Sequence, residues 1–235
     1  MSAPVPARGE APRLVATLAI AGLLSGLAIV SAYRLTRPRI EANEAAALER
    51  AVFQVLPGAV RMERLTWSGS ALVAANGSGD LESSIFTGWS GDGDFVGYAI
   101  PAAGAGFQDT IKLLYGLDRS GSSMLGMTVL ESRETPGLGD RIYKDPHFIA
   151  EFHDLVVVPV IELVKGHGEK PNDVDAITGA TISSKSVVRI LNASCAIWRP
   201  RLPPPGEPVP RSGGDQVPRG VERGGPLPGG QGSAP

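Results

Sequence analysis

The stretch that decides most about this chain is Thr178-Gly179-Ala180-Thr181-Ile182-Ser183-Ser184, which runs directly into a helical pattern. Gly179 has no Cβ, so a backbone or a ligand can approach it closely. Free N–H groups at a helix start, and the positive end of the helix dipole, favour an anion. A threonine hydroxyl there can hydrogen-bond a phosphate or be esterified by one. The segment predicts a phosphate site, although serine and threonine are also ordinary helix caps.

The residues after this stretch predict a helix that is capped by Ser183 or Ser184 and ends near Trp198. One face of that helix is apolar, because its large side chains recur at helical spacing. We expect this face to dock on a sheet and to aim the helix N-terminus at the phosphate site. The chain's only cysteine falls on the same face and is expected to be a buried small hydrophobe. The face consists of Val187, Ile190, Leu191, Cys195 and Trp198.

A second segment upstream, Glu134-Thr135-Pro136-Gly137-Leu138-Gly139, holds two glycines and a proline in six residues. One interpretation is a rigid turn after a strand. The other is a surface for a flat ring with polar and apolar edges. Pro136 fixes its own φ and restricts Thr135 to extended geometry, while both glycines permit close approach. Thr135 offers a hydroxyl and Leu138 an apolar surface, which suits such a ring.

The N-terminal region carries 20 residues without a charge, from Leu14 to Tyr33. At ~1.5 Å per residue a helix of this length matches a hydrocarbon core of ~30 Å. Arg13 and Arg34 bracket it, as expected for a membrane span. The alternative is a cleaved signal peptide with Val30-Ser31-Ala32 at the cleavage site. Because the apolar part of a signal peptide is usually ~7–15 residues long, we favour an uncleaved transmembrane helix over 14–33.

The rest of the chain predicts an α+β fold, with a transmembrane helix followed by one domain over 34–198 whose twisted sheet is flanked by helices. Residues 40–56 are rich in helix formers and stop at Pro57-Gly58. Residues 59–131 alternate apolar runs with turns. Residues 199–235 hold half of the chain's 20 prolines and are expected to form a disordered tail. Expected strands are 95–100, a hairpin of 111–117 with 124–130 around the turn at 118–122, and 156–158, and a glycine-bearing loop lies at 104–107.

Composition excludes several classes of protein and site. The net charge of −2 over 235 residues gives no basic footprint for nucleic acid. One cysteine allows neither an intramolecular disulfide nor an iron–sulfur site built from this chain alone. The three histidines lack a metal-ligand spacing, and no Walker or Rossmann glycine loop is present. We therefore assign no metal ligand.

Two motifs resemble signatures of a known family. Residues 175–181 (DAITGAT) resemble the flavinylation motif of the FMN-binding domain shared by RnfG of the Rnf electron-transport complex and NqrC of the sodium-translocating NADH:quinone reductase. The Glu134–Gly139 string resembles the family's second signature, and the resemblance spans roughly residues 10–198. It implies an FMN whose phosphate is esterified to Thr181 by a separate flavin transferase, which would recognise Asp175, Gly179 and Ala180. Residues placed near the flavin are Thr178, Gly179, Ala180, Ser183, Glu134, Thr135, Gly137 and Leu138. The loop at 104–107 corresponds to a family segment that precedes core strands near the flavin, so it is a further expected contact region. For Arg133 two roles stay open: an ion pair with a carboxylate, or a place near the pyrimidine carbonyls of the ring.

The resemblance also implies a function and a location. It implies a non-autonomous electron-transfer subunit that works with other membrane subunits and couples ferredoxin–NAD chemistry to ion translocation. It further implies a cytoplasmic stub over 1–13, a single pass through the cytoplasmic membrane, and a periplasmic or external flavin domain. The arginines after the span weakly favour the opposite orientation. Two alternatives stay open: the flavin subunit of a sodium-translocating quinone reductase or another envelope reductase, and a non-redox envelope protein that binds partners through its proline-rich tail.

Overall fold

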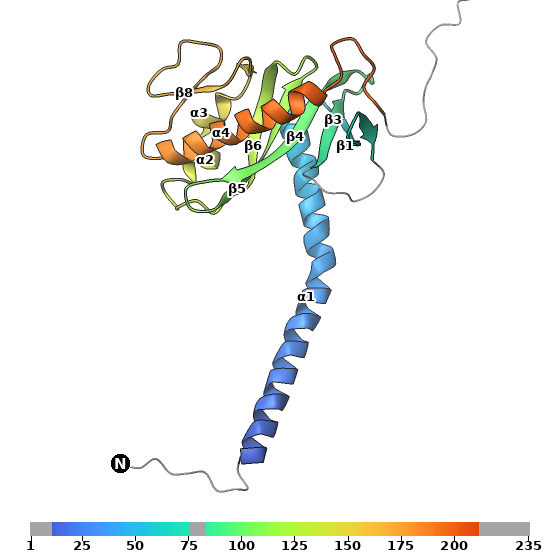
Figure 1. The fold of residues 1–235 in the computed structure, drawn as a ribbon, viewed down its shortest axis with the longest axis vertical. Coiled ribbons are helices and arrows are strands. Elements are labelled where there is room, and N and C mark those ends of the chain that lie inside the picture. Colours follow the sequence, from blue (N-terminus) through green and yellow to red (C-terminus); the bar gives the residue numbers. More distant parts are fainter. Residues whose placement is uncertain (1–10, 76–82, 212–235) are drawn as a thin grey trace, which may run out of the picture.

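The computed structural model describes residues 11–75 and 83–211. A long helix, α1 (Ala11–Val55), leads into a sheet domain, and α4 (Thr181–Trp198) lies across that domain (Figure 1). Within the described residues the main sheet has seven antiparallel strands in the order β2-β1-β3-β4-β5-β6-β7. The predicted α+β class, with an apolar N-terminal helix and a sheet flanked by helices, is confirmed. The strands are β1 (Arg61–Trp67), β2 (Leu72–Ala74), β3 (Ser84–Trp89), β4 (Phe95–Ala105), β5 (Thr110–Asp118), β6 (Ser123–Glu131) and β7 (Leu155–Val156).

The predicted hairpin is present as β5 and β6, which pair in antiparallel register. Its turn is closed by Asp118, whose Oδ1 accepts hydrogen bonds from the N–H groups of Ser122 (2.9 Å) and Ser123 (3.0 Å). Gly121 has φ +67°, which side chains disfavour. β4 is longer than predicted. It continues to Ala105, so the expected loop at 104–107 is shorter. The strand expected at 156–158 is β7, one residue earlier and shorter.

Small elements connect the sheet to α4. The helices α2 (Arg141–Lys144) and α3 (Pro146–Ala150) follow the 134–139 segment, and Asp145 caps α3 by accepting from the His147 N–H at 3.1 Å. A parallel pair of strands, β8 (Glu162–Val164) and β9 (Asp173–Asp175), was not predicted. β9 matters for the site because the chain passes from it directly into the loop before α4.

α4 covers one face of the sheet with the apolar face that its periodicity predicted. Its five predicted apolar side chains are all buried and belong to the main core. The helix packs very closely on β4, since a Cβ at Gly104 would lie 2.6 Å from Ile190 Cγ1. Arg189 adds a hydrogen bond from its Nη2 to the Ala105 carbonyl. The sheet thus fixes the axis of α4 and with it the position of Thr181.

The end of α1 packs on a separate cluster with sheet residues, where Val52, Val55 and Leu56 are fully buried. The end of α1 packs against a row of glycines on four strands: Gly88, Gly97, Gly116 and Gly126. A Cβ at Gly88 would lie 2.6 Å from Leu56 Cδ1, and one at Gly116 would overlap the Val55 carbonyl. The missing side chains therefore let the helix backbone approach the sheet directly.

α1 differs from the two separate segments predicted for 14–33 and 40–56. It is one helix of 45 residues, it already includes residues 11–13, and it continues through Pro38. A proline inside a helix removes one backbone hydrogen bond and strains one turn. The helix formers on both sides outweigh that loss, since helix propagation is cooperative. The apolar part of α1 has no buried residues, and its mean hydropathy is 2.2. Both properties suit a single membrane anchor.

The domain does not end at Trp198, which corrects the predicted start of the tail. Residues 199–211, here called the C-terminal strap, begin with the 3₁₀ helix η2 (Arg199–Arg201) and run beside the sheet domain. Arg199 Nε donates to the Gly121 carbonyl at 2.7 Å, and the Arg211 guanidinium lies 3.8 Å from the centre of the Trp89 ring. Leu202 and Val209 pack against the main core. These contacts could not be predicted from the composition of the strap, which is rich in proline. The predicted tail beyond residue 211 lies outside the described residues.

Candidate functional site

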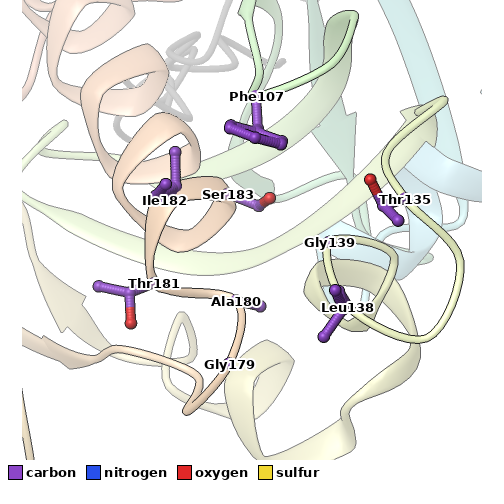
Figure 2. A pocket seen from close by; sticks show the side chains of 9 residues that line it. All are labelled: Phe107, Thr135, Leu138, Gly139, Gly179, Ala180, Thr181, Ile182 and Ser183. Carbon is purple, nitrogen blue, oxygen red and sulfur yellow. The ribbon is translucent and has the colours of Figure 1, made fainter.

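The predicted phosphate segment and the 134–139 segment meet at a cavity of about 340 Å³. Two loops from the sheet side face the first turn of α4 across it (Figure 2). Three large apolar side chains on its wall are more than half exposed: Phe107 (63%), Leu138 (54%) and Ile182 (58%). Exposed apolar groups that gather around a hollow indicate a binding site. The cavity is lined by Phe107, Thr135, Leu138, Gly139, Gly179, Ala180, Thr181, Ile182 and Ser183.

The start of α4 differs from the prediction that Ser183 or Ser184 caps it. The helix begins at Thr181, and its cap residue is Ala180, which offers no side-chain hydrogen bond. Ser184 is instead turned back, since its Oγ donates to the Ala180 carbonyl (3.0 Å) and accepts from the Ile177 N–H (3.2 Å). Among the described residues, the N–H groups of residues 181–183 have no hydrogen-bond acceptor. These free donors at the cavity favour an anion.

Thr181 stands at the first position of this helix and at the cavity wall. Its side chain is half-buried, and the hydroxyl makes one long contact of 3.5 Å to the Ile177 carbonyl. A bond of that length is weak. The hydroxyl oxygen is therefore nearly free, at the positive end of an 18-residue helix dipole.

The loop before Thr181 contains a glycine with a positive φ and accepts a hydrogen bond from an arginine. Gly179 has φ +85°, a conformation that needs glycine, and the nearest heavy atom to a Cβ there would be Leu138 Cδ2 at 4.0 Å. Arg141 donates from Nη1 to the Thr178 carbonyl at 2.7 Å and from Nη2 to Asp145 at 2.9 Å. A guanidinium charge thus lies beside the segment that leads to Thr181.

The two glycines of the 134–139 segment have different roles. Gly137 has φ +78° and open space where a Cβ would stand, so it serves the turn and does not line the cavity. Gly139 does line it, and a Cβ there would lie 2.8 Å from Ser183 Oγ. Thr135 donates its hydroxyl to Gln108 Oε1 at 3.0 Å, which ties this segment to the loop that carries Phe107.

Glu134 lies behind the wall and does not line the cavity. It is 5% exposed, and its Oε1 accepts from the N–H groups of Phe107 (2.9 Å) and Gln108 (3.0 Å). Its Oε2 accepts from Ser183 Oγ at 2.5 Å. Burial acts to raise the pKa of Glu134, but the hydrogen bonds from Ser183, Gln108 and Phe107 outweigh it and hold the pKa below its ordinary value.

The structure brings together most of the residues that the sequence placed near a cofactor. Thr178 is exposed and serves through its carbonyl, while Glu134 and Gly137 support the wall from outside. Arg133 does not line the cavity; its guanidinium is exposed and lies 3.6 Å from Glu131 and 3.9 Å from Asp109. On the wall are Gly179, Ala180, Thr181, Ser183, Thr135 and Leu138.

The resemblance placed the loop at 104–107 near the flavin, and the structure puts Phe107, the last residue of that loop, on the cavity wall. Other residues of the site were not predicted from the sequence. Ile182 follows the key threonine, and its exposure on a helix with an otherwise buried apolar face was not evident from the pattern. Nothing in the sequence indicated that Arg141 bonds the carbonyl of a residue 37 positions away.

The arrangement offers two chemically distinct halves. The helix start supplies free N–H donors and a weakly bonded hydroxyl for a phosphate. The facing half supplies the exposed apolar surfaces of Phe107 and Leu138 for a flat ring. A phosphorylated ligand with an aromatic ring system, such as a flavin mononucleotide, fits this donor set.

Comparison with known proteins identifies the domain that contains the cavity. Residues 106–196 match the model of the FMN-binding domain family. That range includes all the residues that line the cavity.

Among curated proteins, the chain is 30% identical over 185 residues to the G subunit of an ion-translocating oxidoreductase complex from Methanosarcina acetivorans, covering 79% of this chain and 93% of that protein. It is 31% identical over 113 residues to the G subunit of the Na⁺-translocating ferredoxin:NAD⁺ oxidoreductase complex from Acetobacterium woodii, covering 46% of this chain and 52% of that protein. Among solved structures, NqrC of Shewanella oneidensis superposes with a TM-score of 0.55 at 18% identity, covering 64% of this chain and 91% of that chain. The last likeness concerns the fold alone.

Proposed function

This chain belongs to the G-subunit family of ion-translocating oxidoreductase complexes, and from that premise we propose that it is a membrane-anchored electron carrier whose FMN is covalently attached to Thr181. Electrons would pass through the flavin between neighbouring subunits of an Rnf-type complex that couples ferredoxin–NAD chemistry to ion translocation. The proposal needs no catalytic acid, base or nucleophile from this chain, since the flavin supplies the electron chemistry when bound.

The observation that carries the proposal is the position of Thr181. Its hydroxyl is nearly free. Thr181 is the first residue of α4 and belongs to the wall of the cavity that Phe107 and Leu138 also line. A phosphodiester at that oxygen would lie where the free N–H groups of the first turn and the helix dipole stabilise negative charge.

The other residues of the site would bind and orient the cofactor. Phe107, Leu138 and Ile182 would exclude water from the apolar edge of the isoalloxazine. Gly179 and Gly139 would leave room for the ligand, and Arg141 would hold the attachment loop through the Thr178 carbonyl. Covalent attachment suits an external compartment, where a dissociated FMN has little chance of being replaced.

Attachment would require a separate flavin transferase that takes FMN from FAD. The Thr181 oxygen would lose its proton and form the new bond to the FMN phosphorus. The pyrophosphate P–O bond of FAD would break, and AMP would leave with the proton released to solvent. The segment from Asp175 to Thr181 would be the recognised sequence. We further propose a single pass through the cytoplasmic membrane by α1 and a periplasmic or external flavin domain.

The proposal is tested by one variant that removes the Thr181 hydroxyl and one that keeps a hydroxyl at this position. The full chain, Thr181→Val and Thr181→Ser are each co-expressed with a flavin transferase, denatured and separated by gel electrophoresis. We expect flavin fluorescence in the bands of the wild type and of Thr181→Ser, because both retain a hydroxyl. Thr181→Val has nearly the same shape as threonine and should give a dark band.

Either of two results would contradict the proposal. A fluorescent band of denatured Thr181→Val would place the attachment on another residue. A colourless wild type, in a host whose transferase flavinylates a second substrate protein in the same cells, would remove the basis for a covalent flavoprotein.

A further inference from the structure

Glu134 joins three segments that are distant in the sequence and that together form the cavity. Its carboxylate accepts from the N–H groups of Phe107 and Gln108 on one side and from Ser183 Oγ on the other. Phe107 and Ser183 both line the cavity (Figure 2). The carboxylate is therefore hydrogen-bonded to two wall residues that come from different segments of the chain.

The neighbouring glycines leave the space that this carboxylate fills. A Cβ at Gly106 would overlap Glu134 Oε1, and a Cβ at Gly139 would lie 2.8 Å from Oε2. The 106–109 turn itself is closed by a hydrogen bond from the Gly106 N–H to the Asp109 carbonyl at 2.7 Å. The site is thus built around a buried acidic group.

The negative charge of Glu134 is offset by dipoles alone. Among the described residues it forms no ion pair, and Arg133 lies instead near Glu131 and Asp109. On α4, Lys185 is exposed and forms no ion pair among the described residues, and Arg189 donates to the Ala105 carbonyl. Because its hydrogen bonds lower the pKa of Glu134, the group is ionised at neutral pH.

We propose that Glu134 is a positioning residue that fixes the cavity wall, and that its buried charge lowers the reduction potential of the flavin. This inference rests on the proposed function, in which the cavity holds FMN. One electron from a reductant, dithionite in the experiment below, adds one negative charge to the ring system. A fixed negative charge behind a wall of low polarity opposes that addition.

The experiment is a redox titration of the full chain with covalently attached flavin, as wild type, Glu134→Gln and Glu131→Gln. A glutamine at position 134 can keep hydrogen bonds to the Phe107 N–H and the Ser183 hydroxyl, so it removes the charge and retains the link. We expect about a tenfold larger reduced-to-oxidised ratio at a fixed potential, which is about 59 mV for a one-electron step. Glu131 pairs with Lys112 at 2.7 Å in solvent, so Glu131→Gln should leave the ratio near that of the wild type.

A second variant separates charge from general loosening of the wall. Ser183→Ala keeps the carboxylate but removes the hydroxyl that offsets its charge. We expect its reduced-to-oxidised ratio to shift in the direction opposite to that of Glu134→Gln. Loosening alone would move both variants the same way.

A flavin-free readout uses the Thr181→Val chain with and without Glu134→Gln. A carboxyl whose folded-state pKa is lowered contributes stability that is present above its unfolded pKa and is lost as pH falls through the folded value. The chain with Glu134 should therefore lose more stability on acidification below about pH 4.5 than the chain with glutamine.

The outcomes distinguish this inference from the function on which it rests. An unchanged or lower ratio in flavinylated Glu134→Gln overturns the role of the charge and leaves the flavoprotein assignment intact. Equal acid sensitivity of the two flavin-free chains also contradicts an ionised, stabilising Glu134. A wild type without covalent flavin overturns both proposals.

Discussion

Leu138 is 54% exposed at the cavity wall, where a large apolar side chain in water contributes little to the stability of the fold. We expect Leu138→Ala to leave flavin attachment intact and to shift the absorption spectrum or the reduction potential of the flavin, because the ring loses an apolar contact. Leu130, 39% exposed on β6 and outside the cavity, provides a matched control. Spectra and potentials identical to the wild type for both variants would contradict the contact between Leu138 and the ring.

Tyr98 offers a prediction about alkaline pH. It is 1% exposed, and burial raises its pKa to about 12, although the positive charge of Arg119 acts to lower it. Because this value lies above the ordinary ~10, the contribution of Tyr98 to stability is present below pH 10 and is lost as pH rises towards 12. Tyr98→Phe should lose less stability over this range, as measured by unfolding followed through tryptophan fluorescence. Parallel losses in the two proteins would contradict the prediction.

At the residue scale, the sequence predicted the places of two residues whose type has a specific use. Thr181 lies at the start of α4 on the cavity wall, and Gly179 beside it has a positive φ. Contacts between distant segments could not be predicted, because they depend on how the loops fold over each other. The hydrogen bond from Arg141 to the Thr178 carbonyl and the one from Ser183 to Glu134 are of this kind.

The docking of α1 on the row of glycines gives a prediction at the element scale. A methyl group at Gly116 would overlap the Val55 carbonyl, and neither backbone can move easily within the packed sheet. We expect Gly116→Ala to destabilise the domain by about 1–3 kcal/mol through overpacking. The measurement is thermal unfolding in detergent, followed by tryptophan fluorescence, since Trp67, Trp89 and Trp198 all lie in the domain.

Gly91 is the control for that measurement. It lies in the turn before β4, where an added Cβ would have no neighbour within 4 Å, and its φ is not positive. Gly91→Ala should unfold close to the wild-type temperature. Equal unfolding temperatures for Gly116→Ala and Gly91→Ala would show that α1 is not seated on the sheet in this way.

The C-terminal strap gives a second prediction at this scale. The Arg201 guanidinium lies 5.2 Å from the centre of the Trp67 ring and 5.3 Å from that of Trp198, and Arg211 Nη2 donates to the Gly93 carbonyl at 2.9 Å. Each cation–π contact is worth about 0.5–2 kcal/mol. A chain that ends at Trp198 should therefore unfold at a lower temperature than one that ends at Arg211. Identical unfolding temperatures would contradict a stabilising strap.

Among the elements, those with a strong internal period were predictable, and those defined by partners were not. The apolar face of α4 and the β5–β6 hairpin follow from helical spacing and from a turn between two apolar runs. The strap has no apolar period, so its arginine–tryptophan contacts appear only in the folded domain. The cap of α4 was placed too late, because Ser184 bonds the loop before the helix instead of the free N–H groups.

At the scale of the whole molecule, α1 connects an exposed apolar segment to the sheet without a break (Figure 1). Residues 34–47 lie between the predicted membrane span and the first contacts with the sheet cluster, which at ~1.5 Å per residue is about 21 Å of helix. A continuous helix holds the domain more firmly than a flexible linker. The proposed carrier would therefore keep its flavin at a defined distance from the membrane.

The sequence could predict this overall plan but not its continuity. An uncharged run of membrane length and a helix-rich segment are each visible in the composition, but nothing in the sequence predicted that one helix joins them through Pro38. Whether the helix continues through Pro38 depends on the summed helix propensities of the residues on both sides. The proline alone does not decide it.

The measurement that tests the central claim most directly is the intact mass of the denatured full chain, purified after co-expression with a flavin transferase. The account predicts a mass increase of one FMN less one water, which peptide mapping places on Thr181. An unmodified chain, obtained while the transferase is active on a second substrate, or a flavin attached to any other residue, would contradict it.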